Sequence, residues 1–386
     1  MSGSSLGGEE AISDEKTESS QATAKGLSEL TLSHVNALTP YESARRLFAG
    51  SGADKKQIWL NANESPFSSE YSVDSSVFNR YPDCQPNAVI NAYAKYAGLQ
   101  ASQTLVTRGA DEGIELIIRA FCKAGKDSIL ICPPTYGMYA ISAQTFDVGV
   151  NKALLNDDFS LNTDDILQYV GKVKAVFICS PNNPTGTSVV KADIVKVLSA
   201  FKNKAIVVVD EAYIEFDSEQ TQTDLLAQHD NLVILRTLSK AFALAGLRCG
   251  FTLASPAIIN ILLKVIAPYP IPAPVAQIAS KALDDNGLAK MQKDVNVLKA
   301  ELVSLQNQLQ QIGDIKIVGD INANFMLFRS TQKTELMAYL VKNKVLIRDQ
   351  SKQIKLDNCL RISVGTPKQN QILLALIKAF FAYGNQ

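Results

Sequence analysis

Histidine is scarce in this chain, and this scarcity excludes one large group of catalytic and metal sites. The two histidines, His34 and His229, are far apart in sequence. Histidine metal sites and Ser-His-Asp chemistry both need a clustered imidazole, so we expect neither. The six cysteines form no Cys-x-x-Cys unit, and several lie in apolar runs. We therefore expect free thiols in a reducing cytoplasm.

An excess of charge of either sign is also lacking. Lys plus Arg total 38 and Asp plus Glu total 38, so the formal net charge is zero. A neutral chain without a basic cluster gives no electrostatic reason to bind nucleic acid or an anionic membrane. No apolar run approaches the roughly 18 residues of a transmembrane helix. The Walker loop and the Gly-x-Gly-x-x-Gly fingerprint are missing too, which argues against a nucleotide cofactor.

The length of 386 residues allows one large domain with a smaller companion. Residues 1–26 are rich in Ser, Gly, Glu, Lys and Thr and contain few large apolar side chains. Such a segment cannot bury enough surface to offset its ordering entropy, so we predict a disordered tail. The segment also lacks the apolar core of a signal peptide and is too acidic for a typical mitochondrial transit peptide.

From about residue 100, short apolar runs alternate with helical patterns. The runs are 128–132, 174–179, 205–209 and 232–235, and the helical patterns begin at Ile114 and cover 191–202. This alternation predicts an α/β fold in which a mostly parallel sheet lies between helices. Ligands of such sheets bind beyond the carboxyl ends of the strands.

The last hundred residues show the same alternation on a smaller scale. A long amphipathic helix is predicted over 287–312. It is followed by strands at 315–318, 325–328, 345–347 and 360–364 and by helices at 333–343 and 367–383. We interpret this region as a second, smaller α/β domain.

Polar motifs follow three of the predicted strands. The first, Cys179-Ser180-Pro181-Asn182-Asn183-Pro184-Thr185-Gly186, also fits an ordinary turn when taken alone. The second, Asp210-Glu211-Ala212-Tyr213, brings a carboxylate and a phenol to the end of an apolar strand. In the third, Thr237-Leu238-Ser239-Lys240 with Gly246-Leu247-Arg248, the lysine lies among small apolar residues. Desolvation there lowers the pKa of Lys240, which suits covalent chemistry on a carbonyl group.

A fourth motif, Thr107-Arg108-Gly109-Ala110-Asp111-Glu112-Gly113, leads into the helix that contains Ile114. A glycine-rich turn that opens a helix exposes backbone N–H groups, and these form an anion site together with the helix dipole. Simple capping of the helix by Asp111 is the alternative interpretation.

Together these motifs resemble the histidinol-phosphate aminotransferases, a family within the fold-type-I aminotransferases that depend on pyridoxal phosphate (PLP). The resemblance extends from about residue 30 to the end of the chain. It is carried further by Leu38-Thr39-Pro40-Tyr41, Trp59-Leu60-Asn61-Ala62-Asn63-Glu64, Arg80-Tyr81-Pro82-Asp83-Cys84-Gln85-Pro86, Pro133-Pro134-Thr135-Tyr136-Gly137-Met138-Tyr139, Leu346-Ile347-Arg348-Asp349 and Arg361-Ile362-Ser363-Val364-Gly365.

The resemblance implies a role for each motif residue. Lys240 would carry PLP covalently, Asp210 would pair with its pyridine nitrogen, and Tyr136 would stack on its ring. Tyr213 and Asn183 would hydrogen-bond its phenolic oxygen. The phosphate would be held by Ala110, Asp111, Thr237, Ser239 and Arg248, and by Tyr81 from the other subunit of a homodimer. Tyr41, Asn183, Arg348 and Arg361 would bind substrate. For Arg348 or Arg361, an internal salt bridge such as one with Asp349 or Asp357 is the alternative.

The implied activity is transfer of an amino group from glutamate to imidazole acetol phosphate, which gives histidinol phosphate and 2-oxoglutarate in histidine biosynthesis. An aminotransferase for aromatic amino acids and a PLP-dependent decarboxylase of a phosphorylated amino acid are the enzymatic alternatives. A catalytically inactive PLP-binding regulatory module is opposed by the presence of every expected catalytic residue type. The implied domains are an arm at 27–60, a large PLP-binding domain at 61–285 with a seven-stranded sheet, and a small domain at 286–386.

Overall fold

The computed structural model describes residues 29–40 and 57–383. Contacts divide the chain into two units, Met1–Tyr41 and Glu42–Gln386. In the first unit, the described part contains the short helix α2 (Ser33–Asn36). The predicted tail at 1–26 and the substrate residue Tyr41 lie outside the described residues, so both stay predictions. The second unit contains three described sheets, of two, four and seven strands.

The large sheet has seven strands in the order β2-β8-β7-β6-β5-β3-β4. Strands β3, β4, β5, β6 and β7 run parallel, and β8 runs antiparallel to both of its neighbours. The predicted α/β fold with a mostly parallel sheet is therefore confirmed. The bounds are β2 (Thr104–Thr107), β3 (Ser128–Ile131), β4 (Gly149–Lys152), β5 (Ala175–Cys179), β6 (Ile206–Asp210), β7 (Leu232–Thr237) and β8 (Gly250–Ala254).

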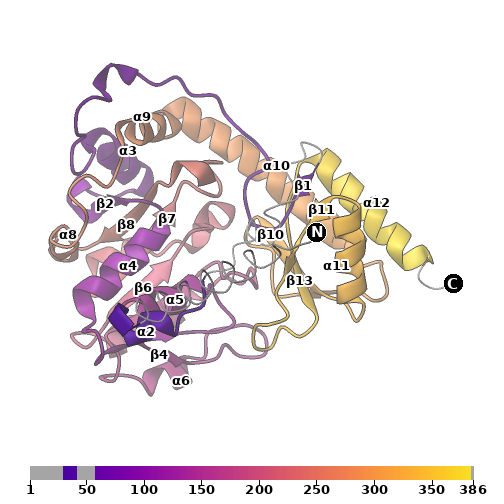
Figure 1. Cartoon of the computed structure of the whole chain (residues 1–386), viewed down its shortest axis with the longest axis horizontal. Coiled ribbons are helices and arrows are strands. Elements are labelled where there is room, and N and C mark those ends of the chain that lie inside the picture. The colour runs from indigo at the N-terminus through magenta and orange to yellow at the C-terminus, as the bar shows by residue number, and fades with distance from the viewer. Residues whose placement is uncertain (1–28, 41–56, 384–386) are drawn as a thin grey trace, which may run out of the picture. The chain divides into compact units, whose positions relative to one another are not determined.

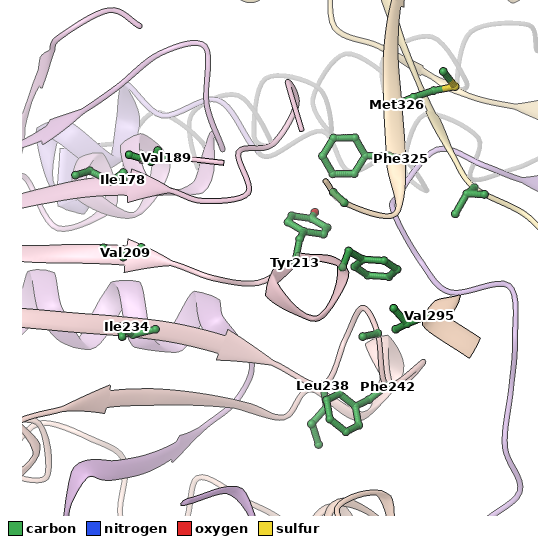
Figure 2. Packing of buried hydrophobic residues seen from close by; sticks show 14 of the residues in the cluster. Ile178, Val189, Val209, Tyr213, Ile234, Leu238, Phe242, Val295, Phe325 and Met326 are labelled. Atoms are coloured by element: carbon green, nitrogen blue, oxygen red, sulfur yellow. The ribbon is translucent and has the colours of Figure 1, made fainter. Parts of the chain in front are cut away.

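Both faces of this sheet are buried, which explains why its central strands are continuous apolar runs. Val207 and Val209 of β6 pack into one core cluster, whereas Val208 between them packs into the other. Helices α4 (Ala110–Phe121), α5 (Met138–Thr145) and α8 (Pro256–Leu262) contribute to the cluster of Val208. Helices α3 (Asn87–Ala97), α7 (Lys191–Ala200) and α9 (Ala273–Ala282) contribute to the other. Figure 2 shows this second cluster along the sheet at Ile178, Val209 and Ile234.

A second, antiparallel sheet follows in sequence, with the order β12-β13-β10-β9. Its strands are β9 (Lys316–Val318), β10 (Phe325–Arg329), β12 (Arg348–Asp349) and β13 (Cys359–Ser363). The predicted strand at 345–347 is shorter, because the chain leaves β11 (Val345–Leu346) and begins β12 two residues later. Strand β11 pairs in parallel with β1 (Ile58–Trp59), far away in sequence.

Four further helices are described: α6 (Thr163–Leu167), the long α10 (Asp285–Leu309), α11 (Lys333–Lys342) and α12 (Pro367–Tyr383). Figure 1 shows α6 near β4 of the large sheet and α11 near β13 of the second sheet. Met291, Val295, Leu298 and Leu302 form a buried stripe along α10. Among the described residues, no helix has both the length and the apolar character that crossing a membrane requires. The domain boundaries at 27–60, 61–285 and 286–386 stay a prediction.

Candidate active site

The motif residues meet at the carboxyl ends of β5, β6 and β7. Parallel pairing aligns Cys179 with Asp210, and Asp210 with Leu235. The segments that follow these strands therefore start at one edge of the sheet, as the alternation of strands and helices predicted. Glu211, next to Asp210, forms an ion pair of 2.7 Å with the buried Arg236.

Lys240 is partly buried. Its Nζ donates a hydrogen bond of 3.2 Å to the carbonyl oxygen of Ala62 and lies 5.5 Å from the centre of the Tyr213 ring. Burial lowers the pKa of Lys240 to about 8, and the positive charge of Arg361 acts in the same direction. The neutral amine, which is the nucleophilic form, is therefore accessible near neutral pH.

The Asp210 carboxylate is 2% exposed. It accepts hydrogen bonds from the Tyr139 hydroxyl at 2.6 Å and from the Ala212 N–H at 3.1 Å. Burial raises the pKa of Asp210 to about 6, although both hydrogen bonds oppose this shift. Within the described chain this carboxylate forms no ion pair, so a cation beside it would stabilise its charged form.

Tyr213 is also buried, and Figure 2 shows its ring close to Phe325 of β10. The two rings meet edge to face, with centres 5.2 Å apart. The Tyr213 hydroxyl accepts a hydrogen bond of 3.0 Å from Asn63 Nδ2. Burial raises the pKa of Tyr213, so the phenol keeps its proton at neutral pH.

The start of α4 and the segment after β7 lie in contact and form a polar corner. Gly109, the N-cap of α4, has a φ of 82°, and a Cβ there would meet Arg248 Nη2 at 2.6 Å. Arg248 in turn lies 3.4 Å from Ser239 Oγ and 3.4 Å from Asp111 Oδ2. The Thr237 hydroxyl donates to Ser239 Oγ at 2.8 Å. Hydroxyls, a guanidinium and first-turn N–H groups thus converge, as a phosphate requires.

Asp111 does not cap α4, so the alternative interpretation of this residue is wrong. The N-cap residue of the helix is Gly109, and no side chain caps it. The Asp111 carboxylate instead accepts a hydrogen bond of 3.0 Å from the Tyr136 hydroxyl. The N–H of Arg108, just before the helix, donates to Glu112 at 2.7 Å.

Arg361, on β13, is 6% exposed. Its guanidinium donates hydrogen bonds to Asn183 Oδ1 and to the carbonyl oxygen of Asn61. The guanidinium carbon, Cζ, lies 5.3 Å from the centre of the Phe325 ring. Arg348, on β12, is directly opposite Arg361 in the antiparallel register. The carboxylate of Asp349, the residue next to Arg348, bonds Lys333 at 2.7 Å.

Tyr81 is separate from this group of residues. It is 83% exposed, and its ring stacks on that of Tyr269 with centres 4.6 Å apart.

The sequence alone assigned no role to Tyr139 or Asn63, although both lie in motifs that carry the family resemblance. Across residues 29–40 and 57–383, no group of three His, Cys, Asp or Glu side chains is arranged to hold a metal ion.

These residues fit a flat aromatic cofactor that carries a phosphate. A buried carboxylate without a cation suits a protonated ring nitrogen. The corner around Gly109 suits the phosphate, because a larger residue there would collide with Arg248. A lysine amine of lowered pKa suits covalent attachment to an aldehyde.

Comparison with known proteins identifies the family of this chain. The family model "Aminotransferase class I and II" matches residues 55–377, and the chain belongs to this family. Histidinol-phosphate aminotransferase from Pseudoalteromonas atlantica is 62% identical over 348 residues, which are 90% of this chain and 94% of that protein. The enzyme of the same name from Yersinia enterocolitica is 50% identical over 93% of this chain and 94% of its own. The expected resemblance is thereby confirmed.

Solved structures show the same fold. Histidinol-phosphate aminotransferase from Clostridium acetobutylicum superposes with a TM-score of 0.76 at 25% identity, covering 84% of this chain and 99% of its own. The Sinorhizobium meliloti enzyme, solved in complex with pyridoxal-5'-phosphate, gives a TM-score of 0.80 at 19% identity, with coverages of 92% and 98%. The predicted fold type is therefore confirmed.

Proposed function

We propose that this chain is a PLP-dependent aminotransferase that converts imidazole acetol phosphate and L-glutamate into L-histidinol phosphate and 2-oxoglutarate, reversibly, in histidine biosynthesis. The observation that carries the proposal is the close similarity to histidinol-phosphate aminotransferase, 62% identity over 90% of the chain. The convergence of Lys240, Asp210 and Tyr213 at one sheet edge supports it.

Bound PLP supplies an electron-withdrawing ring that takes up the electron pair left at the substrate Cα. Asp210 would keep the ring nitrogen protonated, since a nearby opposite charge favours the charged form. Lys240 would hold the cofactor covalently. Once the substrate amine has displaced Lys240 from the cofactor, its free Nζ would accept the proton that the substrate Cα loses. The phenolic oxygen would accept hydrogen bonds from Tyr213 and Asn183, and Tyr136 would stack on the ring. The phosphate would be held by Ala110, Asp111, Thr237, Ser239 and Arg248.

In this proposal the substrate is bound by Arg361, Arg348, Asn183 and Tyr41. Glutamate and histidinol phosphate both offer an anion, and an arginine fork accepts either by paired hydrogen bonds. Each active site is shared in a homodimer, with Tyr81 reaching the phosphate of the neighbouring subunit. We also propose the cytoplasm as location, supported by six cysteines that are all free thiols.

The decisive experiment assays purified protein with histidinol phosphate, and with a panel of aromatic amino acids, against 2-oxoglutarate. We expect histidinol phosphate to be the preferred amino donor. A preference for an aromatic amino acid, or release of carbon dioxide without a keto-acid acceptor, would contradict the assigned substrate.

A second experiment tests the cofactor lysine. Borohydride should fix PLP to Lys240, and Lys240→Ala should lose turnover by many orders of magnitude. Lys204→Ala is the matched control, because Lys204 is exposed and precedes β6 at the opposite end from Asp210. Reduced cofactor found on another lysine contradicts the assignment.

A further inference from the structure

A buried polar network surrounds Asn63, which is 1% exposed. The Asn63 N–H donates to Ser363 Oγ at 2.8 Å, and the Ser363 hydroxyl donates back to Asn63 Oδ1 at 3.1 Å. Asn324 Nδ2 donates to the Asn63 carbonyl oxygen at 2.9 Å. Asn63 Nδ2 donates to the Tyr213 hydroxyl at 3.0 Å. The residue thus joins the second sheet to Tyr213.

The network determines which way the Asn63 amide faces. Ser363 Oγ accepts the backbone N–H of Asn63, so its own proton is available for Asn63 Oδ1. With Oδ1 bound in this way, the NH₂ group is the one that faces Tyr213. Ser363 and Asn324 are 1% and 0% exposed, so water does not compete for these contacts.

The amide orientation has a consequence for Tyr213. A tyrosine hydroxyl has one proton to donate, and here its oxygen accepts from Asn63. The proton must therefore point away from Asn63. Burial raises the pKa of Tyr213 while the hydrogen bond from Asn63 opposes that rise, so the phenol remains a protonated donor.

We propose that Asn63 is a positioning residue for the aminotransferase reaction, which directs the Tyr213 hydroxyl to donate to the phenolic oxygen of bound PLP. This inference rests on the proposed function. Asn63 acts through Tyr213, and its own position is fixed by Ser363 of β13 and by Asn324, which directly precedes β10.

The backbone of Asn63 allows its side chain to be tested separately. Its φ of 54° is in the left-handed region, which glycine adopts without strain. Asn63→Gly therefore removes Nδ2 and Oδ1 while the two backbone hydrogen bonds to Ser363 and Asn324 can persist. Tyr213→Phe removes the hydroxyl on which Asn63 is proposed to act.

The test follows the pH titration of the visible absorption band of PLP-loaded protein, beside kcat and KM. A donor at the phenolic oxygen stabilises its negative charge, so losing that donor makes the oxygen more basic. Asn63→Gly should therefore raise the midpoint of the titration by roughly half to one pH unit. In the Tyr213→Phe background the same substitution should add no further shift.

Two results overturn the inference: an unchanged midpoint in Asn63→Gly, or an equal shift in the Tyr213→Phe background. If Asn63→Gly does not fold, Ser363→Ala takes its place, because it removes the hydroxyl that orients the amide. It should raise the midpoint in the same direction, and no shift there overturns the inference. Wild-type protein that takes up no PLP overturns the proposed function itself, which separates the two failures.

Discussion

At the scale of single residues, the site contains two groups whose pKa values differ from their usual values in water. Burial lowers the pKa of Lys240 to about 8 and raises the pKa of Asp210 to about 6. A partly neutral amine can attack the carbonyl group of a heterocyclic cofactor. A buried carboxylate is stabilised by a cation, such as the protonated nitrogen of that heterocycle. Both shifts come from the same cause, because the sheet edge and the segments around it exclude water.

The lowered pKa of Lys240 predicts how PLP loading depends on pH. In protein freed of cofactor, the rate of PLP incorporation should rise roughly tenfold per pH unit and level off above about pH 8. Because the folded pKa is below the unfolded value of about 10.4, the unfolded chain binds more protons between these two pH values. Lys240 therefore costs stability at neutral pH, and this cost is relieved as pH rises through that window.

Stopped-flow absorbance across pH measures this dependence, and Arg361→Ala is the informative variant. Removing that positive charge should move the plateau to higher pH, since Arg361 also lowers the pKa of Lys240. A plateau only above about pH 10, as for a lysine in water, would contradict the shielding of Lys240.

A second prediction at this scale concerns the shared anion site. Arg361→Ala should weaken both half-reactions, because losing a desolvated arginine–anion contact costs roughly 2–5 kcal/mol. That cost corresponds to about 30- to several-thousand-fold in kcat/KM. Arg361→Lys should recover only part of the loss, because an ammonium lacks the planar fork.

Single-turnover assays with glutamate and with histidinol phosphate separately measure the effect. Arg329→Ala on the neighbouring β10 is the matched control. Arg329 bonds the carbonyl oxygens of Asp357 and Lys355 rather than any residue of the site. A glutamate half-reaction that is unaffected by Arg361→Ala would show that the two substrates do not share this residue.

At the scale of elements, the sequence predicted the strands that are continuous apolar runs better than the strands that polar residues or glycine interrupt. Strands β5, β6 and β7 are continuous apolar runs, and all three were expected. Strands β2, β4 and β8 were not expected, because threonine, asparagine and glycine interrupt their apolar pattern. These strands are stabilised by pairing with other strands of the sheet, and that pairing cannot be read from the local sequence pattern.

The same limit applies to the site. Residues that follow parallel strands could be expected to meet, because the strand ends share one edge. The hydrogen bond between Tyr139 and Asp210 could not be predicted, since 71 residues separate the partners. The same holds for Asn63 and Tyr213, which are 150 residues apart. A hydrogen bond over such a separation depends on the packed fold rather than on spacing in sequence.

A prediction at the scale of elements concerns the contact between two turns. Gly319 follows β9 with a φ of 68°, and a Cβ there would meet the Thr185 carbonyl oxygen at 2.1 Å. The N–H of Asp320 donates to the same oxygen at 2.8 Å. This contact joins the Cys179–Gly186 motif, which contains Asn183, to the second sheet.

Gly319→Ala should therefore lower the free energy of unfolding more than Gly98→Ala. Gly98 has a φ of 70°, but a Cβ added there would meet no atom within 4 Å, so its substitution measures backbone strain alone. That strain costs about 1–2 kcal/mol, and the collision at Gly319 should add about 1–3 kcal/mol. Urea unfolding of both variants measures the difference, and equal losses would show that the turns can separate freely.

At the scale of the whole molecule, the high exposure of the Tyr81 side chain is not explained by contacts within the single chain. It is 83% exposed and stacks on Tyr269, which is itself 50% exposed. Large aromatic side chains at such exposure are typical of interaction sites. A second copy of the chain, related by a two-fold axis, would cover both tyrosines reciprocally.

The last prediction tests this shared site by mixing two inactive variants. Tyr81→Ala should lack the phosphate contact supplied to the neighbouring subunit, and Lys240→Ala should lack the cofactor lysine of its own site. In a hybrid dimer, the site that contains wild-type Lys240 receives wild-type Tyr81 from the Lys240→Ala subunit, so one site in two is restored. Activity should recover with the fraction of hybrid, measured after denaturation and refolding of the mixture. If subunit exchange is demonstrated and no activity returns, Tyr81 acts within its own chain or only packs against Tyr269.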